Sequence, residues 1–238
     1  MKVAGEWLSH PGTQALCAAL TAAGYRALFV GGCVRNAVLG EPVADIDLTT
    51  DALPDTVTEL AEAAGFKVVP TGLDHGTVTV IGQGRPHEVT TFRRDVETDG
   101  RRAVVAFSDR IEEDAQRRDL TMNALYADAS GQVIDPLGGL PDTLARRVRF
   151  VGDPETRIRE DYLRILRFFR FRACYGGPAG GIDAEGLAAC AVLAEGLARV
   201  SRERVTGELR KLLSARDPAP AVAAMAQSGV LAQILPGA

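Results

Sequence analysis

Two aspartates separated by a single residue are the first side chains in this sequence that could do chemistry. Asp45 and Asp47 alternate with apolar residues, a pattern that predicts a short strand. Residues two apart on a strand project from the same face, so the two carboxylates would lie side by side. Adjacent carboxylates repel each other unless a cation lies between them, which suits Mg²⁺. Taken alone, the pair is equally compatible with a solvated edge strand.

A third carboxylate comes from a predicted hairpin. Glu88 lies in the β-rich stretch 87–92, and a glycine-containing turn at 82–84 separates this stretch from another at 77–81. An acid on such a strand is better explained as a ligand than as surface decoration, although an exposed edge position would also explain it. Three carboxylates on adjacent strands describe a two-metal phosphoryl-transfer site.

A pair of glycines precedes these acids. Gly31 and Gly32 lie between a predicted strand and a helical turn that ends before Gly40. Backbone N–H groups in such a turn can approach an anion closely, and Arg35 would supply a charged fork for phosphate oxygens. Most Gly-Gly pairs are plain turns, so this motif alone is weak evidence.

The elements that must position these residues divide the chain in two. We expect an α+β fold: a head of residues 1–150, with a small mixed or antiparallel sheet and flanking helices, followed by an all-α region of residues 151–238. The charged stretch 93–108 is predicted to be a loop, and residues 111–126 are predicted to be mainly helical. Other predicted helices are 13–23, 54–64 and most of the chain after residue 157, and other predicted strands are 25–30, 45–49 and 132–134.

Composition describes an ordinary globular protein. The chain has 238 residues, 46% of them hydrophobic, and a net charge of −4, which argues against a protein that coats nucleic acid over its whole surface. No apolar run approaches the length of a membrane helix and no signal peptide precedes the first motif, so we expect a soluble, cytoplasmic protein that does not bind membranes. The cysteines have no zinc-site spacing and are expected to be reduced: Cys17, Cys33, Cys174 and Cys190.

Taken together, the motifs resemble those of the class II CCA-adding enzyme and bacterial poly(A) polymerase family, within the polymerase-β-like nucleotidyltransferases. The glycine turn with Arg35, then Gly40, then the Asp45 and Asp47 pair is similar to the family signature. The resemblance covers about residues 25–236 and continues in the family's order. The further motifs are Thr71-Gly72-x-x-His75-Gly76-Thr77, Glu88-Val89-Thr90-Thr91-Phe92-Arg93, Arg117-Arg118-Asp119-Leu120-Thr121-x-Asn123-Ala124, Asp135-Pro136, Gly138-Gly139, Glu160-Asp161-x-x-Arg164-x-x-Arg167-x-x-Arg170-Phe171 and Ser201-Arg202-Glu203-Arg204-Val205.

The resemblance implies a reaction and its partners. An RNA 3′-hydroxyl would attack the α-phosphorus of CTP or ATP, and the leading expectation is CCA addition to the 3′ end of tRNA with Mg²⁺ as the cofactor. The loop at 95–102 resembles one that the family uses to switch from C to A. Alternatives are a poly(A) polymerase, a CC- or A-adding enzyme, and a non-catalytic nucleotide- or RNA-binding module. The implied nucleotide contacts are Gly31, Gly32, Arg35, Arg118, Asp119, Asn123, Asp161, Arg164, Arg167 and Arg170.

Base selection by protein side chains is also implied by the family, and two residues explain how it could work. Asp161 accepts hydrogen bonds and Arg164 donates them, and at i and i+3 on a predicted helix both lie on one face. Cytosine and adenine present the matching amino group and ring acceptor, whereas uracil and guanine present the reverse. An ordinary surface salt bridge is the alternative. Arg167 and Arg170 continue the spacing, as phosphate ligands or as a solvated basic face.

Three further features complete the expectations. Asp119 and Asn123 are predicted at i and i+4 on one helix. The family usually has Asp where this sequence has Asn36, and the amide keeps an acceptor oxygen while losing the charge. Family members usually carry further helical domains that grip the tRNA acceptor arm. This chain is therefore either truncated or a short form that binds RNA weakly or with a partner, and the sequence predicts no oligomeric state.

Overall fold

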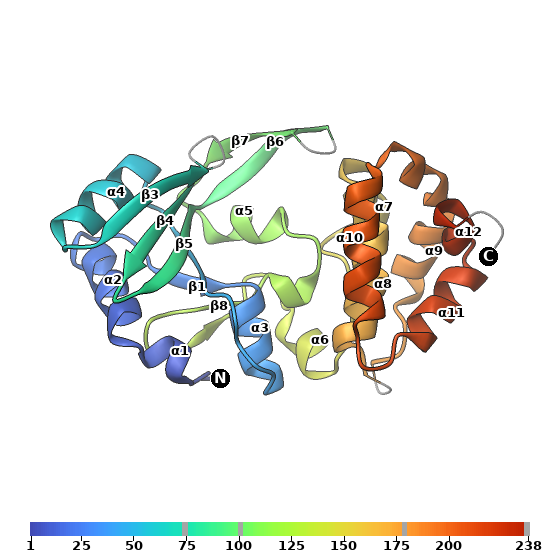
Figure 1. Ribbon diagram of the computed structural model, residues 1–238, viewed down its shortest axis with the longest axis horizontal. Coiled ribbons are helices and arrows are strands. Elements are labelled where there is room, and N and C mark those ends of the chain that lie inside the picture. The colour runs from blue at the N-terminus through green and yellow to red at the C-terminus, as the bar shows by residue number, and fades with distance from the viewer. Residues whose placement is uncertain (73–75, 100–101, 178–179, 236–238) are drawn as a thin grey trace. The chain divides into compact units, whose positions relative to one another are not determined.

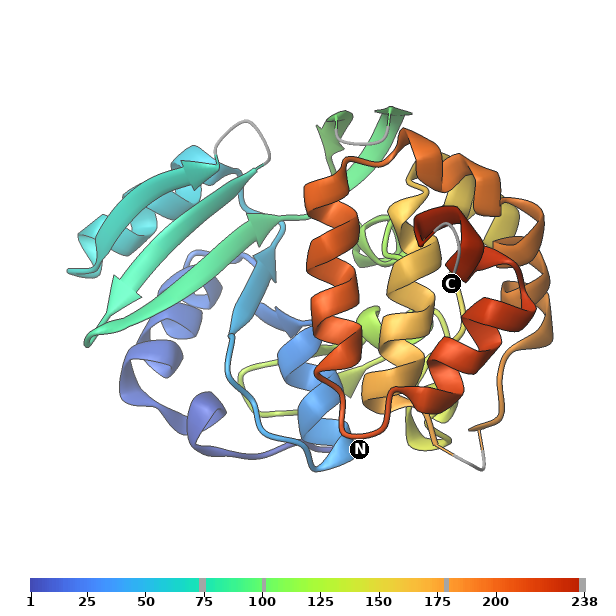
Figure 2. The same cartoon turned by 45° about the vertical axis from the view of Figure 1, so that its right-hand side comes forward.

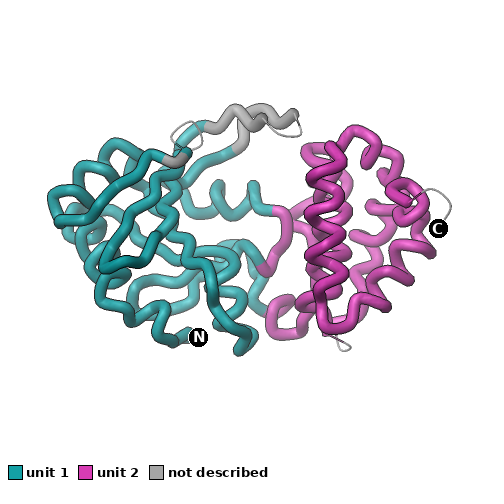
Figure 3. Tube along the Cα trace, in the orientation of Figure 1, with its two compact units in different colours: residues 1–96, 105–118, 123–140 teal, residues 97–104, 119–122, 141–238 magenta. Residues whose placement is uncertain are grey.

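The computed structural model describes residues 1–72, 76–99, 102–177 and 180–235, and the chain divides into two compact units (Figure 3). The head unit comprises Met1–Val96, Val105–Arg118 and Asn123–Leu140, and the helical unit comprises Glu97–Val104, Asp119–Met122 and Pro141–Ala238. The predicted division after residue 150 differs from this one. Leu120 pairs with Phe150 in an isolated β-bridge, and both side chains are buried in the core of the helical unit.

The head unit is built on one seven-stranded sheet with the strand order β3-β4-β5-β2-β1-β8-β9 (Figure 1). Only β2 and β5 pair in parallel among these strands, and the other pairs are antiparallel. The predicted mixed sheet with flanking helices is therefore confirmed. The strands are β1 (Leu28–Val30), β2 (Asp47–Thr50), β3 (Lys67–Gly72), β4 (Thr77–Gly82), β5 (Arg85–Thr91), β8 (Tyr126–Ala127) and β9 (Val133–Ile134).

The hairpin that joins β4 to β5 follows from its turn chemistry. Gly82 pairs with Arg85, which leaves a loop of two residues, Gln83 and Gly84, both with positive φ (49° and 79°). Positive φ at both loop positions is the conformation that matches the twist of a tight hairpin. The predicted hairpin is confirmed, and its register brings Glu88 of β5 opposite Thr79 of β4.

Helices cover the head sheet and supply its core. α2 and α4 pack against each other and against β4. Leu16 and Leu20 of α2 are fully buried with Leu48 of β2 and Val80 of β4. Each such side chain contributes about 1.5–3 kcal/mol by leaving water. The helices of this unit are α1 (Glu6–Ser9), α2 (Pro11–Ala22), α3 (Gly32–Leu39), α4 (Pro54–Ala63) and α5 (Ile111–Gln116).

Two predicted segments differ from the structure. The stretch predicted as a loop forms two paired strands, β6 (Arg93–Asp99) and β7 (Arg102–Phe107). The predicted helix over 111–126 ends with α5 at Gln116 and is followed by a short 3-10 helix, η2 (Thr121–Asn123). Backbone hydrogen bonds between residues 119–121 and residues 149–151 explain why the helix ends early: Thr121 N donates to Arg149 O (2.9 Å), and Val151 N donates to Asp119 O (3.0 Å). Long-range pairing has overridden the local helical pattern.

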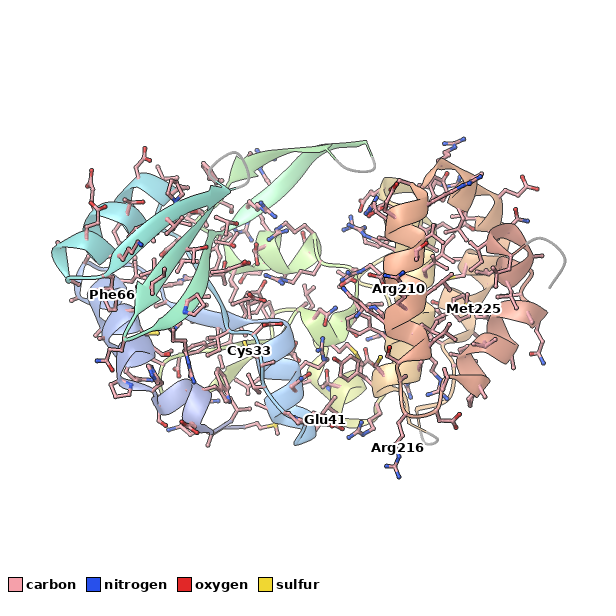
Figure 4. The ribbon with its side chains drawn as sticks, viewed as in Figure 1. Cys33, Glu41, Phe66, Arg210, Arg216 and Met225 are labelled. Carbon is pink, nitrogen blue, oxygen red and sulfur yellow. The ribbon has the colours of Figure 1, made fainter. Side chains whose placement is uncertain are left out.

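The helical unit packs α10 alongside α8 (Figures 1 and 2). Its core is aromatic: the rings of Phe150 and Phe168 stack with centroids 5.3 Å apart, and Phe169 meets Phe168 edge to face. Met225 of α11 is buried in the same cluster (Figure 4). The elements that begin after the head sheet are α6 (Leu140–Leu144), α7 (Pro154–Glu160), α8 (Leu163–Tyr175), α9 (Ala184–Val192), the 3-10 helix η4 (Ala194–Arg199), α10 (Arg202–Leu213), α11 (Ala219–Gln227) and α12 (Val230–Ile234).

The cysteines are free, as predicted. Cys17, Cys33 and Cys190 are buried, and Cys174 is exposed. Burial raises the pKa of Cys33 to about 11, so the thiol beside the glycine turn stays protonated and inert at neutral pH. Figure 4 marks Cys33 in the head unit. Within the described ranges, no helix has the length and apolar character needed to cross a membrane.

Candidate active site

The three predicted carboxylates line one pocket of the head unit, with a volume of about 710 Å³. Asp47 is the first residue of β2, and it lies directly opposite Glu88 on the parallel strand β5. Paired residues on neighbouring strands project from the same face, so these two acids are neighbours. Asp45 lies in the exposed segment that precedes β2. The prediction that both aspartates lie on the strand is therefore wrong for Asp45, although it reaches the same pocket.

The electrostatics of Asp47 favour a cation nearby. Burial raises its pKa above the usual carboxyl range, the negative charges of Glu88 and Asp45 add to the rise, and the charge of Arg118 opposes it. A positive ion would relieve this repulsion. No three or more His, Cys, Asp or Glu side chains form a ready ligand cluster in the part of the chain that the structure describes. Mg²⁺ usually takes one or two carboxylates together with water and substrate phosphates, so the donor set fits it.

The glycine turn lies at the end of β1. Gly31 has φ +72°, a conformation that favours glycine, and a Cβ added there would lie 3.5 Å from Nη1 of Arg118. α3 begins at Gly32, and no side chain caps this end of the helix. N–H groups in the first turn of a helix have no partner within the helix and favour an anion. The turn thus places a possible phosphate site next to the guanidinium of Arg118.

A buried network that the sequence did not reveal holds Arg118. Asp114 of α5 is fully buried, and its Oδ2 accepts from Arg118 Nη2 (2.9 Å) and from the Tyr126 hydroxyl (2.7 Å). Arg117 pairs with the other carboxylate oxygen (2.8 Å). Burial alone would raise the pKa of Asp114, but its arginine partners and the Tyr126 hydrogen bond together hold it below the usual value. The four-residue spacing of Asp114 and Arg118 on a predicted helix was the available signal.

Arg35 is held within the head unit. Only 6% of its surface is exposed, and Nη1 donates to Asn123 Oδ1 at 2.6 Å. Its Nε and Nη2 donate to Asn36 Oδ1 at 3.1 and 2.9 Å, and Asn36 Nδ2 donates to Pro42 O at 2.7 Å. The structural hydrogen bond expected of Asn36 is confirmed. In this structure Arg35 and Asn123 are joined as a brace for the first turn of α3, and the guanidinium is bonded within the protein.

In the helical unit, the structure does not place Asp161 and Arg164 on one helix. α7 ends at Glu160, Asp161 has an extended backbone (φ −155°, ψ 105°), and α8 begins at Leu163. The prediction of a shared helical face is wrong, because Asp161 Oδ1 accepts from Leu163 N (3.1 Å) and so starts a new helix. Arg164 is ion-paired with Glu160.

The partner of Asp161 is an arginine 43 residues further along the chain. Nη2 of Arg204, on α10, donates to Asp161 Oδ2 at 2.6 Å. Sequence reasoning missed Arg204 and Glu160 as parts of this cluster, although each belongs to a motif that the resemblance rests on. Asp161 therefore lies between a helix start and a cation, which fixes the direction of its carboxylate.

Two other predicted arginines are ion-paired on α8. Arg167 contacts Asp119 Oδ2 through Nη2 and Nε, both at 2.6 Å, and Arg170 pairs with Glu208 of α10 at 2.6 Å. Because both arginines are ion-paired within the protein, they do not form a solvated basic face. The predicted helical pairing of Asp119 with Asn123 is wrong, because Asp119 lies outside any helix and belongs to the helical unit, whereas Asn123 belongs to the head unit. His75 lies outside the described residues.

Two family models match this chain. Residues 27–149 match the model described as the poly A polymerase head domain, and residues 181–238 match a probable RNA- and SrmB-binding site of polymerase A. The first match contains all three pocket carboxylates, and the second contains Arg204 and Glu208.

Curated relatives and solved structures agree with these matches. The CCA-adding enzyme of Geobacillus thermodenitrificans is 42% identical over 90% of this chain and 52% of its own length, and the human mitochondrial CCA tRNA nucleotidyltransferase 1 is 43% identical over 77% and 42%. A crystal structure of the Bacillus stearothermophilus CCA-adding enzyme in complex with CTP matches 95% of this chain and 53% of that one, at 38% identity and a TM-score of 0.83. The chain thus spans about half the length of the relatives it matches.

Proposed function

We propose, because this chain belongs to the family of the poly(A) polymerase head domain, that it adds CMP and AMP from CTP and ATP to the 3′ end of tRNA without a template. The observation that carries the proposal is the pocket that Asp45, Asp47 and Glu88 line together. Relatives named as CCA-adding enzymes favour this reaction over poly(A) synthesis, and the match to an RNA-binding model supports RNA as the partner.

The carboxylates suit phosphoryl transfer. Asp45 and Asp47 would hold Mg²⁺, which would supply activation of the attacking hydroxyl and neutralisation of the triphosphate charge, and Glu88 completes the acidic set. The 3′-oxygen of the RNA forms a bond to the α-phosphorus, the bond from that phosphorus to the leaving pyrophosphate breaks, and the hydroxyl proton passes to water. Burial and the negative charges of Glu88 and Asp45 raise the pKa of Asp47, and a cation in the pocket would oppose both effects.

The triphosphate is bound by backbone groups and one guanidinium. N–H groups of Gly32 and the first turn of α3 face the phosphates, and Arg118 supplies charge beside them. Arg35 and Asn123 act as the brace that keeps the turn in place, since their side chains are bonded to each other. Asp114 and Tyr126 in turn hold Arg118.

Base selection is assigned to Asp161 and Arg164. Each carboxylate oxygen has two lone pairs, so Asp161 can still accept from a base amino group while bonded to Arg204 and Leu163. Arg164 donates to the ring acceptor of cytosine or adenine. Uracil and guanine leave these groups unpaired, which makes their rejection strong. The ion pairs of Arg167 with Asp119 and of Arg170 with Glu208 stabilise the part of the helical unit that carries Asp161 and Arg164.

The experiment is incubation of the chain with Mg²⁺ and a tRNA that lacks its 3′ CCA, supplied with each labelled nucleotide singly and then with CTP and ATP. Addition of two C and one A is the expected result, with a loss of at least about a hundredfold in Asp45→Ala and on chelation of Mg²⁺. Glu62→Ala, an exposed acid on α4, is the control that keeps activity.

Other outcomes of this experiment identify the alternatives. Long A tails indicate a poly(A) polymerase, and addition that stops after two C or requires a preformed CC end indicates a partial enzyme. Nucleotide binding without incorporation indicates a non-catalytic module and contradicts the proposal. A cytoplasmic location stays a prediction from the sequence.

A further inference from the structure

The two residues that link α7 to α8 decide how Asp161 and Arg164 lie relative to each other. Asp161 is extended, and Tyr162 has already turned into the helical conformation (φ −60°, ψ −17°). The side chain of Arg164 reaches back over this link: its Nη1 donates to Arg157 O at 2.9 Å and pairs with Glu160, and both partners belong to α7. The place of Arg164 therefore depends on the angle at which α7 meets α8.

The ring of Tyr162 is seated on the backbone of η4. A Cβ added to Gly196 would lie closer than 3.0 Å to three carbons of this ring. Gly196 does not have the positive φ that would itself favour glycine, so the ring is what excludes a side chain at this position. The guanidinium of Arg199, the last residue of η4, also lies 5.4 Å from the centre of the same ring.

η4 is a fixed seat because its apolar side chains belong to the core of the helical unit. Leu197 is 3% exposed and Ala194 is 5% exposed, and both lie in the cluster that contains Leu166 of α8. Tyr162 packs against this cluster. Protein interiors are packed too densely to absorb a displaced ring, so a shift of the ring has to move the link that carries it.

The link is thus held at two neighbouring positions by two different elements. Arg204 of α10 holds the carboxylate of Asp161, and Gly196 of η4 receives the ring of Tyr162. The ion pair alone fixes one end of one side chain and leaves the link free to rotate about it. The ring contact removes that freedom.

We propose that Tyr162 is a positioning residue for base selection: its ring, seated on Gly196, fixes the link between α7 and α8 and so the relative places of Asp161 and Arg164. The base contacts are those of Asp161 and Arg164, and Tyr162 acts through them. Rejection of a base through unpaired polar groups requires that the protein's donor and acceptor be held to about 0.5 Å. The inference rests on the proposed function, because that function assigns base selection to these two residues.

Calorimetric titration of CTP and of UTP into the full chain measures selection without RNA and without catalysis. Wild type is expected to bind CTP more tightly than UTP. Gly196→Ala, whose Cβ displaces the ring, should reduce the ratio of the two affinities about tenfold, or ~1.4 kcal/mol. Tyr162→Phe keeps the ring and should keep the ratio within about twofold of wild type. Gly207→Ala on α10 is the matched control with an unchanged ratio, since a Cβ there meets nothing within 4 Å.

A double-variant cycle shows whether the ring carries the effect. In Tyr162→Ala the seat is empty, so the ratio should already be reduced about tenfold, and the addition of Gly196→Ala should reduce it no further. Equal reductions from Gly196→Ala with and without the ring overturn the inference, because the glycine then acts on η4 alone. Equal weakening of both affinities, with the ratio unchanged in Gly196→Ala and Tyr162→Ala, overturns it as well, because that is a general loss of structure. If circular dichroism shows that Gly196→Ala is unfolded, the comparison of Tyr162→Ala with Tyr162→Phe decides.

The two proposals fail separately. If the chain prefers CTP and loses this preference with the ring but adds no nucleotide, the positioning role stands and the proposed reaction is wrong. If the chain adds nucleotides with a selection that Gly196→Ala and Tyr162→Ala leave unchanged, the reaction stands and the positioning role is wrong.

Discussion

Removal of one hydroxyl tests whether the buried network around Asp114 holds Arg118. In Tyr126→Phe the ring stays in the core, but Asp114 Oδ2 loses its 2.7 Å donor and Arg118 Nε loses its 3.2 Å acceptor. Burial raises the pKa of Tyr126, so the hydroxyl is a protonated donor across the neutral range. The change therefore removes two defined contacts while the apolar packing of a fully buried side chain is kept.

The magnitude follows from the charge on the acceptor. A hydrogen bond to a charged group contributes about 1.5–3 kcal/mol, so we expect the free energy of unfolding to fall by that amount. For a chain of this size the melting temperature falls by roughly 3–12 °C, measured by calorimetry or circular dichroism. The looser guanidinium should raise KM for CTP about threefold to tenfold, or ~0.7–1.4 kcal/mol.

A matched tyrosine supplies the control. Tyr25 is half-buried in the same unit, and no hydrogen bond from its hydroxyl to the described residues is present. Tyr25→Phe should change the free energy of unfolding by less than about 0.5 kcal/mol. If Tyr126→Phe is no less stable than Tyr25→Phe, or if its KM for CTP is unchanged, the network does not position Arg118.

Three further predictions concern charges at fixed positions. The folded-state pKa of Asp114 is lowered, so its contribution to stability is present above the unfolded value near 3.8 and is lost as pH falls through the folded value. The difference in melting temperature between wild type and Asp114→Asn should therefore narrow below about pH 4, as measured by thermal unfolding. Arg204→Gln frees Asp161 and should raise UMP or GMP incorporation relative to CMP about tenfold in single-nucleotide extension, and unchanged discrimination contradicts this. Asn36→Asp gains a charged hydrogen bond to Arg35 but loses the amide N–H that donates to the backbone carbonyl of Pro42. The free energy of unfolding, measured with urea, should therefore change by less than about 1 kcal/mol. A larger decrease shows that the lost donor dominates.

The fold was predictable where local chemistry decides the structure. A glycine-containing turn between two alternating β-rich stretches predicts a hairpin, and the structure has it with Gln83 and Gly84 as the loop residues. The segment 111–126 was not predictable in the same way. Its backbone pairs with residues 149–151 about thirty positions later, and no periodicity within a window of 16 residues reports such a partner. The paired strands β6 and β7 were missed because charged residues mask their pattern.

The candidate site shows the same division. The spacing of Asp45 and Asp47 and the predicted hairpin that carries Glu88 placed the three acids together, and the structure has all three in one pocket. The partner of Asp161 was hidden, because its ion pair with Arg204 joins positions 43 residues apart. Sequence spacing predicts contacts within a helix, and it carries no information on which helix lies opposite.

Ion pairs in and around α8 give three arginines of the helical unit a structural role. Arg167 pairs with Asp119, Arg170 with Glu208, and Arg204 with the acid that precedes α8. The Arg170 and Glu208 side chains are at most 14% exposed, so removal of one partner leaves an uncompensated charge and costs about 3–5 kcal/mol. Apolar replacements could stabilise the unit equally well, but they would not fix one register of α10 along α8. A single register keeps Arg204 at Asp161, and the proposed selection of a base depends on this contact.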